Sequence, residues 1–281
     1  AKRQPGSTIK TFVYLAALRD GWSPDDEIAN TEITEGSYRP RNANERYSDT
    51  ITLRDALARS SNVATVRLFN EVGSDRVIGL ARDLGINSPI ARGDPSVALG
   101  TAGMSLMELT AAYAGIAGNS YPVRPTAFVR EPVGLWDRIF NAPRSMSAST
   151  HREIERLLRT AINSGTGRAA QLPGPNFGKT GTTQNNRDAL FVGYAGDLVV
   201  GVWIGNDDNT PLKGISGGGL PARIWKAFMR RAQGSGDAAP ARRRSPNAPV
   251  QPLDVPDARD IPESIEEDGV EITTDESGIT I

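Results

Sequence analysis

The spacing of apolar residues changes near residue 176, and this change most limits the folds open to the chain. Before it, segments 7–21, 52–59, 62–70, 74–84, 105–117 and 150–163 carry helical patterns or helix start and stop signals. After it, segments 176–183, 189–196 and 198–206 are typical of strands, and their short links favour antiparallel neighbours. A last helix begins at Pro221. Helices followed by a meander of strands predict an α+β fold.

A change in composition at residue 234 predicts a domain boundary. Beyond it, proline recurs and large apolar residues become rare. Residues 235–281 hold eleven acidic and four basic residues, a net charge of −7, whereas the whole chain carries −1. A segment of this kind has too little apolar surface to form a core. We therefore expect one domain over residues 1–234 and a disordered, acidic, Pro-rich tail over 235–281, either inert or partner-binding.

Three residue types that are absent or scarce limit the chemistry. Cysteine is absent, and the one histidine, His151, lies in a polar run that favours a surface position. This argues against thiolate chemistry and a Ser-His-Asp triad. Lysine occurs only at positions 2, 10, 179, 213 and 226, and arginine, the other basic residue, stays charged. Acid–base chemistry is thus left to a few lysines, to carboxylates, to tyrosine or to hydroxyls.

The first motif with chemical meaning is Ser7-Thr8-Ile9-Lys10. Residues three apart share one face of a helix, so the Ser7 hydroxyl and the Lys10 amine can lie within hydrogen-bond reach. A serine is a weak nucleophile until a base takes its proton, and a buried lysine with a lowered pKa can do so. The motif favours an activated serine at a helix start.

The second motif is Ser60-Ser61-Asn62, at a junction between two predicted helices. Ser60 can relay a proton between Lys10 and a leaving group, and Asn62 can hold a substrate amide and the Lys10 amine. Serine and asparagine are also ordinary helix caps, so the motif has little meaning by itself.

The third motif, Lys179-Thr180-Gly181-Thr182, lies within a predicted strand. Gly181 leaves room for a ligand to lie along the strand. The Thr182 N–H can point at an oxyanion, and Lys179 with the hydroxyls of Thr180 and Thr182 can bind a carboxylate. By itself, the motif fits a plain edge strand equally well.

In this order the three motifs resemble those of penicillin-binding proteins and serine β-lactamases. The chain is similar to the class A, bifunctional penicillin-binding proteins over about residues 1–232. The runs that carry this resemblance are 2–7, 56–64, 95–100, 164–169, 178–183, 187–189 and 201–208.

The resemblance implies a penicillin-binding/serine β-lactamase-like fold, with an antiparallel sheet flanked by helices and a helical subdomain. The first two strands of that fold precede the nucleophile, so we expect them to be missing and the sheet to have an exposed edge. Ser7 would be the nucleophile, and the N–H groups of Ser7 and Thr182 would form the oxyanion hole. The base would be Lys10 alone or Lys10 acting through Ser60.

The resemblance also implies a function. The chain would be a peptidoglycan D,D-transpeptidase that cross-links stem peptides ending in D-Ala-D-Ala, and β-lactam antibiotics would acylate the same serine. No metal, organic cofactor or nucleic acid would take part. The full-length protein would work at the periplasmic, extracytoplasmic face of the inner membrane, held by an N-terminal anchor that this sequence lacks.

Two other classes of protein stay open. The first is a hydrolase on the same fold, either a D,D-carboxypeptidase or a serine β-lactamase. A β-lactamase needs a base for deacylation, and no segment resembles the one that supplies such a carboxylate. The second is a non-catalytic β-lactam sensor or scaffold that keeps the pocket without transferring acyl groups.

Overall fold

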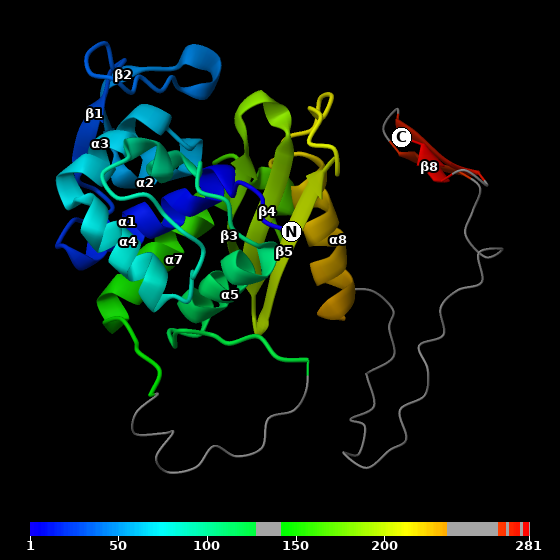
Figure 1. Cartoon of the computed structure of the whole chain (residues 1–281). Coiled ribbons are helices and arrows are strands. Elements are labelled where there is room, and N and C mark those ends of the chain that lie inside the picture. Colours follow the sequence, from blue (N-terminus) through cyan, green and yellow to red (C-terminus); the bar gives the residue numbers. More distant parts are fainter. Residues whose placement is uncertain (128–141, 235–263, 268–269, 276–277, 281) are drawn as a thin grey trace. The chain divides into compact units, whose positions relative to one another are not determined.

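A computed structural model describes residues 1–127, 142–234, 264–267, 270–275 and 278–280. The chain divides into two compact units, Ala1–Ala238 and Ala239–Ile281. The first unit combines helices with antiparallel strands, so the predicted α+β class is confirmed (Figure 1).

Helices are the main regular structure of the first unit. None of the helices in the described residues is both long and apolar enough to cross a bilayer. The predicted helical segments are confirmed, with ends that differ by a few residues. The α-helices are α1 (Lys10–Arg19), α2 (Leu53–Arg59), α3 (Asn62–Val72), α4 (Ser74–Asp83), α5 (Leu106–Ala117), α7 (Ala148–Asn163) and α8 (Leu220–Ala232), and the 3₁₀ helices are η1 (Gly6–Ile9), η2 (Ala43–Glu45), η3 (Pro95–Leu99), η4 (Arg168–Ala170) and η5 (Gln184–Asn186).

The three predicted strands form one antiparallel sheet. They are β3 (Phe177–Thr182), β4 (Asp188–Ala195) and β5 (Leu198–Gly205), in the order β3-β4-β5. In the part of the chain that the structure describes, this sheet has no further strand, so β3 and β5 are both edges. An edge strand leaves alternate backbone groups free to pair with a ligand.

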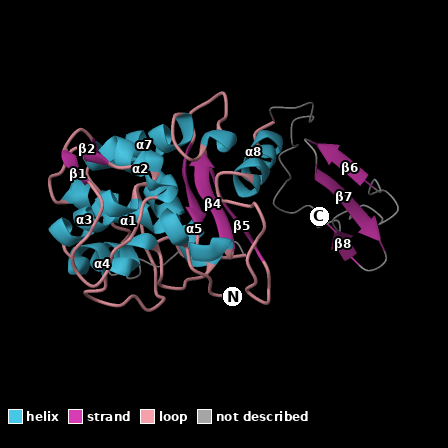
Figure 2. Ribbon diagram, turned by 90° about the horizontal axis from the view of Figure 1, so that it is seen from above, coloured by secondary structure: helices cyan, strands magenta, loops and turns pink. Residues whose placement is uncertain are grey.

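The middle strand, β4, is buried on both faces. Alternate side chains of a strand point to opposite faces, and here they enter two separate apolar clusters. Leu190 and Val192 join the main core, whereas Phe191 joins Trp225 of α8, with 5.2 Å between ring centroids. The sheet is therefore a layer between α8 on one side and α5 and the other helices on the other (Figure 2).

Helix α1 lies at the centre of the helical part, against α3, α4 and α7. Its residues from Lys10 to Leu18 are all buried, with Phe12 and Leu15 fully so. A helix that is buried all round belongs to the protein core, and packing on every side fixes its position. The helix thus carries Lys10 into the interior.

A small hairpin was not predicted from the sequence. Strands β1 (Glu27–Asn30) and β2 (Ser48–Thr52) pair antiparallel, with Ile28 opposite Ile51. Both are short and largely polar, and β2 is mostly exposed, so they lack the alternating pattern that marks a half-buried strand.

The second unit contains β6 (Ser264–Glu267), β7 (Val270–Asp275) and β8 (Gly278–Thr280), in the antiparallel order β6-β7-β8. The sequence analysis predicted a disordered tail, so it did not predict these strands. Apolar Val270 and Ile272 alternate with polar neighbours, a pattern that favours strands. The rest of segment 235–281 lies outside the described residues.

Candidate active site

Lys10 connects the first two predicted motifs. It occupies the first turn of α1 and is fully buried. Its Nζ donates to the backbone oxygen of Ser60 at 2.7 Å and to Asn62 Oδ1 at 2.6 Å. The Ser60 hydroxyl and the Ser61 carbonyl oxygen, both at 3.3 Å, are further acceptors. The junction between α2 and α3 is thereby fixed around a single amine.

Lys179 approaches the same hydroxyl from the sheet. It lies on β3, is fully buried, and donates from Nζ to Ser60 Oγ at 3.0 Å and to the Thr180 carbonyl oxygen at 3.3 Å. The Ser60 hydroxyl therefore lies between two lysine amines that come from distant parts of the chain.

Burial changes the acidity of both amines. Burial, and secondly the positive charge of Lys179, lower the pKa of Lys10 well below its ordinary value of 10.5. Burial lowers the pKa of Lys179 to about 7. Two ammonium groups in one dry cluster repel each other, so one of them readily gives up its proton. The pair can hold one neutral amine and one ammonium near neutral pH.

The backbone around Ser60 and Asn62 is held by side chains that the sequence analysis did not select. Ser60 ends α2 in a left-handed conformation, with φ at 58°. The backbone N–H of Asn62 donates to Asn42 Oδ1 at 2.7 Å, and the hydroxyl of Ser61 donates to Asn30 Oδ1 at 2.7 Å. Asn30 belongs to the unpredicted hairpin, so no local signal could have indicated its role.

Ser7 lies on η1, whose backbone packs directly against β3. A Cβ on Gly6 would lie 2.8 Å from the Thr182 carbonyl oxygen, and a Cβ on Gly181 would lie 2.6 Å from the Pro5 carbonyl oxygen. Real Cβ atoms do not come so close, so these positions need glycine. Gly181 was expected to make room for a ligand, but it makes room for the segment that leads to Ser7.

Ser7 and Lys10, which were expected to lie within hydrogen-bond reach, form no hydrogen bond with each other. The Ser7 hydroxyl has no partner within the described residues, and Lys10 donates to residues 60–62 instead. Residues three apart also share a face in a 3₁₀ helix, so the cause is the set of acceptors that residues 60–62 offer to the Lys10 amine. The Ser7 side chain is only partly buried and its hydroxyl is not engaged, so it remains available to a ligand.

The backbone of Thr182 faces the open edge of the sheet. In an antiparallel pair, only every second residue exchanges hydrogen bonds with its partner strand. Thr183 N donates to the Asp188 oxygen at 3.0 Å, so Thr182, opposite Ala189, belongs to the other set. Its N–H points away from β4. The N–H of Ser7 is in the first turn of a helix, where such groups lack helical partners. Two donors thus lie close together beside Gly6.

Two further hydroxyl contacts extend the site. The hydroxyls of Thr166 and Thr180 lie 2.7 Å apart, and the Gly217 N–H donates to Thr182 Oγ1 at 3.0 Å. Thr166 is anchored by its own N–H, which donates to the Ala58 oxygen at 3.0 Å. The sequence analysis noted run 164–169 only for its resemblance, and gave Thr166 no role.

His151 takes no part in this cluster. Its Nε2 lies 2.8 Å from the Ile116 carbonyl oxygen, and its side chain is 20% exposed. The prediction of a surface histidine is therefore only partly right, because the ring is half-buried between α7 and α5. The absence of a contact with Ser7 agrees with the argument against a triad.

The family model of the penicillin-binding protein transpeptidase domain matches residues 1–230. The chain belongs to this transpeptidase family. The match ends close to the predicted boundary at residue 234.

Known transpeptidase relatives are penicillin-binding proteins 1A. The one from Neisseria meningitidis serogroup A is 32% identical over 267 residues, which cover 85% of this chain and 33% of the relative. The one from Rickettsia conorii is 33% identical over 268 residues, which cover 83% and 34%. This chain therefore spans about a third of the length of these relatives.

Solved structures support the same fold. Penicillin-binding protein 1A from Haemophilus influenzae has a TM-score of 0.71 at 23% identity, covering 95% of this chain and 45% of that one. PonA1 from Mycobacterium tuberculosis, in complex with penicillin V, has a TM-score of 0.67 at 25% identity, covering 83% and 69%. The predicted penicillin-binding fold is thus confirmed.

Proposed function

We propose that this chain is a peptidoglycan D,D-transpeptidase that works through an acyl-enzyme on Ser7 and is acylated by penicillin. The observation that carries the proposal is the Ser60 hydroxyl, 3.3 Å from Lys10 Nζ and 3.0 Å from Lys179 Nζ, beside the open edge of β3. Membership of the transpeptidase family supports the reaction class, and the complex of PonA1 with penicillin V supports β-lactam binding.

Each candidate residue has a role in acyl transfer. Ser7 Oγ attacks the carbonyl carbon of the penultimate D-Ala and loses its proton to the neutral amine of Lys10, directly or through Ser60. The N–H groups of Ser7 and Thr182 stabilise the oxyanion. The amide C–N bond then breaks, and the leaving D-Ala takes a proton through Ser60.

Binding is assigned to the remaining residues. The Lys179 ammonium and the hydroxyls of Thr180 and Thr182 hold the terminal carboxylate, while Gly181 lets η1 approach. Asn62 Nδ2, which donates to the Arg41 oxygen at 2.7 Å, keeps the Asn62 side chain oriented towards Lys10. An amine from a second stem peptide then attacks the ester, a new amide forms, and Ser7 regains its proton.

The protein to which this domain belongs would carry out this reaction at the periplasmic face of the inner membrane. The partners would be stem peptides ending in D-Ala-D-Ala, without nucleic acid. The competing hydrolase function would transfer the acyl group to water, giving a D,D-carboxypeptidase or a β-lactamase. A non-catalytic β-lactam sensor would stop at the acyl-enzyme.

Intact mass after penicillin treatment tests the proposal. We expect one long-lived adduct on the wild-type chain and none on Ser7→Ala, because the ester needs the Ser7 oxygen. Incubation with a D-Ala-D-Ala peptide and an amine acceptor should give cross-linked dimers. Rapid loss of the adduct would favour a β-lactamase, and a stable adduct without dimers or hydrolysis would favour a sensor. An adduct that persists on Ser7→Ala would contradict the assignment.

A further inference from the structure

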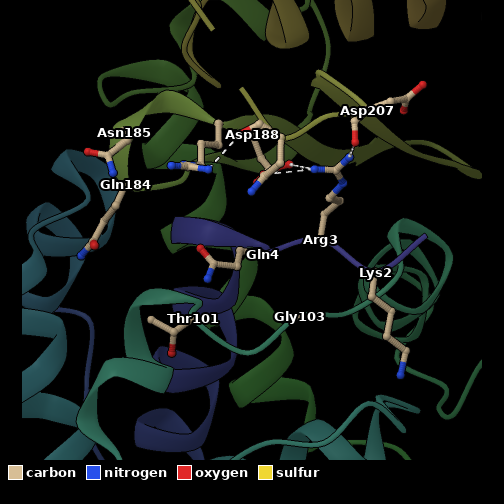
Figure 3. Close-up of a pocket in the computed structure, with 11 residues that line it drawn as sticks. Lys2, Arg3, Gln4, Thr101, Gly103, Gln184, Asn185, Asp188 and Asp207 are labelled. Atoms are coloured by element: carbon tan, nitrogen blue, oxygen red, sulfur yellow. Dashed lines mark hydrogen bonds and ion pairs between the residues drawn. The ribbon is translucent and has the colours of Figure 1, made fainter. Parts of the chain in front are cut away.

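A polar pocket of about 790 Å³ opens where the Ser7 segment and β3 leave the candidate active site (Figure 3). Three segments contribute the side chains that matter here, namely the segment before Ser7, the loop after η3, and the loop between β3 and β4. These side chains are Lys2, Gln4, Thr101, Gln184, Asn185 and Arg187.

The pocket continues the direction of a peptide bound along β3. The proposed carboxylate site uses Lys179 and Thr180, and the proposed oxyanion hole uses Thr182, further along the same strand. The part of the substrate before its D-Ala-D-Ala end must therefore run on towards Gln184. Strand residues rise about 3.3 Å each, so one or two substrate residues reach the pocket.

The pocket is lined by three cations, Lys2, Arg3 and Arg187, and by two carboxylates, Asp188 and Asp207. Arg3 also lines the pocket, but its guanidinium lies 4.0 Å from buried Asp188 and 5.1 Å from the centre of the Trp203 ring. Lys2 and Arg187 have no carboxylate partner among the described residues, although Arg187 donates to the Asn209 oxygen at 2.9 Å. Two cations thus remain available to an anionic ligand.

Unpaired amides surround these cations. The side chains of Gln4, Gln184 and Asn185 make no hydrogen bond within the described residues. Figure 3 shows Gln4 and Gln184 facing the space between the Ser7 segment and the β3–β4 loop, with the Asp207 carboxylate on the far side. Asn185 is held with φ at 61°, in the left-handed region, at the tip of this loop. Amides with free donors suit carboxylate and peptide oxygens.

We propose that this pocket is the subsite for the upstream part of the donor peptide, and that Lys2 and Arg187 select an upstream carboxylate. The proposal rests on the proposed function, because it takes the D-Ala-D-Ala end to be bound at Ser7 and β3. A charge-assisted contact of this kind favours the carboxylate over its amide by about 5- to 10-fold in an open pocket.

Equilibrium binding to the Ser7→Ala chain tests the subsite without turnover. The probes are two peptides, acetyl-Glu-Glu-D-Ala-D-Ala and acetyl-Gln-Gln-D-Ala-D-Ala, which differ only in upstream charge. We expect the acidic peptide to bind about 5- to 10-fold more tightly at low salt. The preference should shrink as salt screens the pocket. Adding Lys2→Gln and Arg187→Gln should bring the two Kd values within about twofold.

Controls separate charge from folding. Lys213→Gln removes an exposed lysine outside the pocket and should keep the preference. Arg187→Lys keeps the positive charge and should keep most of the preference for the acidic peptide. Melting curves show whether each variant is folded. Equal affinity for the two peptides, a preference that survives the double substitution, or no binding of either peptide would each overturn the subsite. Penicillin labelling of the chain with Ser7 intact reports on the proposed function separately.

Discussion

At the scale of single residues, the pair Lys10 and Lys179 makes the reaction depend on pH. The pKa of Lys10 is well below 10.5, so its neutral amine, the proposed acceptor of the Ser7 proton, persists to a pH well below that value. The pKa of Lys179 is about 7, so its ammonium, the proposed partner of the substrate carboxylate, is lost as pH rises through 7. The proposed acylation needs the first amine neutral and the second charged.

We therefore predict a bell-shaped rate of acylation by penicillin between pH 5 and 10. The acid limb reports protonation of Lys10, and the alkaline limb, starting near pH 7, reports loss of the Lys179 proton. Stopped-flow or mass-spectrometric rates across this range measure the profile. A rate that stays constant from pH 5 to 10 would contradict the assigned roles.

Thr166 is a second prediction at this scale. Its hydroxyl lies 2.7 Å from that of Thr180, and we expect the contact to orient the Thr180 hydroxyl towards the carboxylate of the proposed substrate. Thr166→Val keeps the shape but removes the hydroxyl, so kcat/KM for a D-Ala-D-Ala peptide should fall about 3- to 10-fold, mainly through KM. Thr166→Ser restores the hydroxyl and should recover most of the loss. A valine variant as active as wild type would remove Thr166 from the site.

At the scale of elements, the contact between η1 and β3 sets the position of Ser7. A Cβ on Gly181 would lie 2.6 Å from the Pro5 oxygen, so Gly181→Ala must push the two elements apart. We expect a loss of about 1–3 kcal/mol of unfolding free energy and slower acylation by penicillin. Denaturant curves and labelling rates measure both effects.

Gly174→Ala is the matched control, because a Cβ at Gly174 would meet no atom within 4 Å. It should leave both quantities nearly unchanged. If Gly181→Ala behaves in the same way as this control, the packing of η1 on β3 does not determine the geometry of the site.

Helices and strands were predicted correctly from the sequence where the features that specify them, such as helix caps and apolar periodicity, lie within a few residues of one another. Thr52, for example, caps α2 by accepting from the Asp55 N–H, three residues further on, at 3.2 Å. The pairing of β1 with β2 was missed because both strands are short and mostly polar, and only Ile28 and Ile51, which face each other, enter the main core. The segment before Lys10 was predicted to be regular helix, but packing against β3 holds it as a 3₁₀ turn.

At the scale of the whole molecule, the sheet depends on apolar contacts on both faces. Trp225 is fully buried against Phe191 and donates from Nε1 to the Gly193 oxygen at 3.3 Å. Trp225→Ala should cost about 3–5 kcal/mol of unfolding free energy, because it leaves a cavity between α8 and β4. Phe228→Ala, on the same helix but 51% exposed, should cost less than about 0.5 kcal/mol. Equal losses in the two variants would contradict the two-sided core.

The sequence by itself determined which residue types were available for chemistry and where the α-helices and the three strands of the main sheet lie, because periodicity, caps and turn residues act over a few positions. Only the tertiary structure decided that Lys10 binds Asn62, 52 residues away, and that Lys179 binds Ser60, 119 residues away. It also left the Ser7 hydroxyl without a hydrogen bond to Lys10, whose amine donates to residues 60–62. Such contacts follow from how helices and sheet pack together, and no short stretch of sequence contains that information.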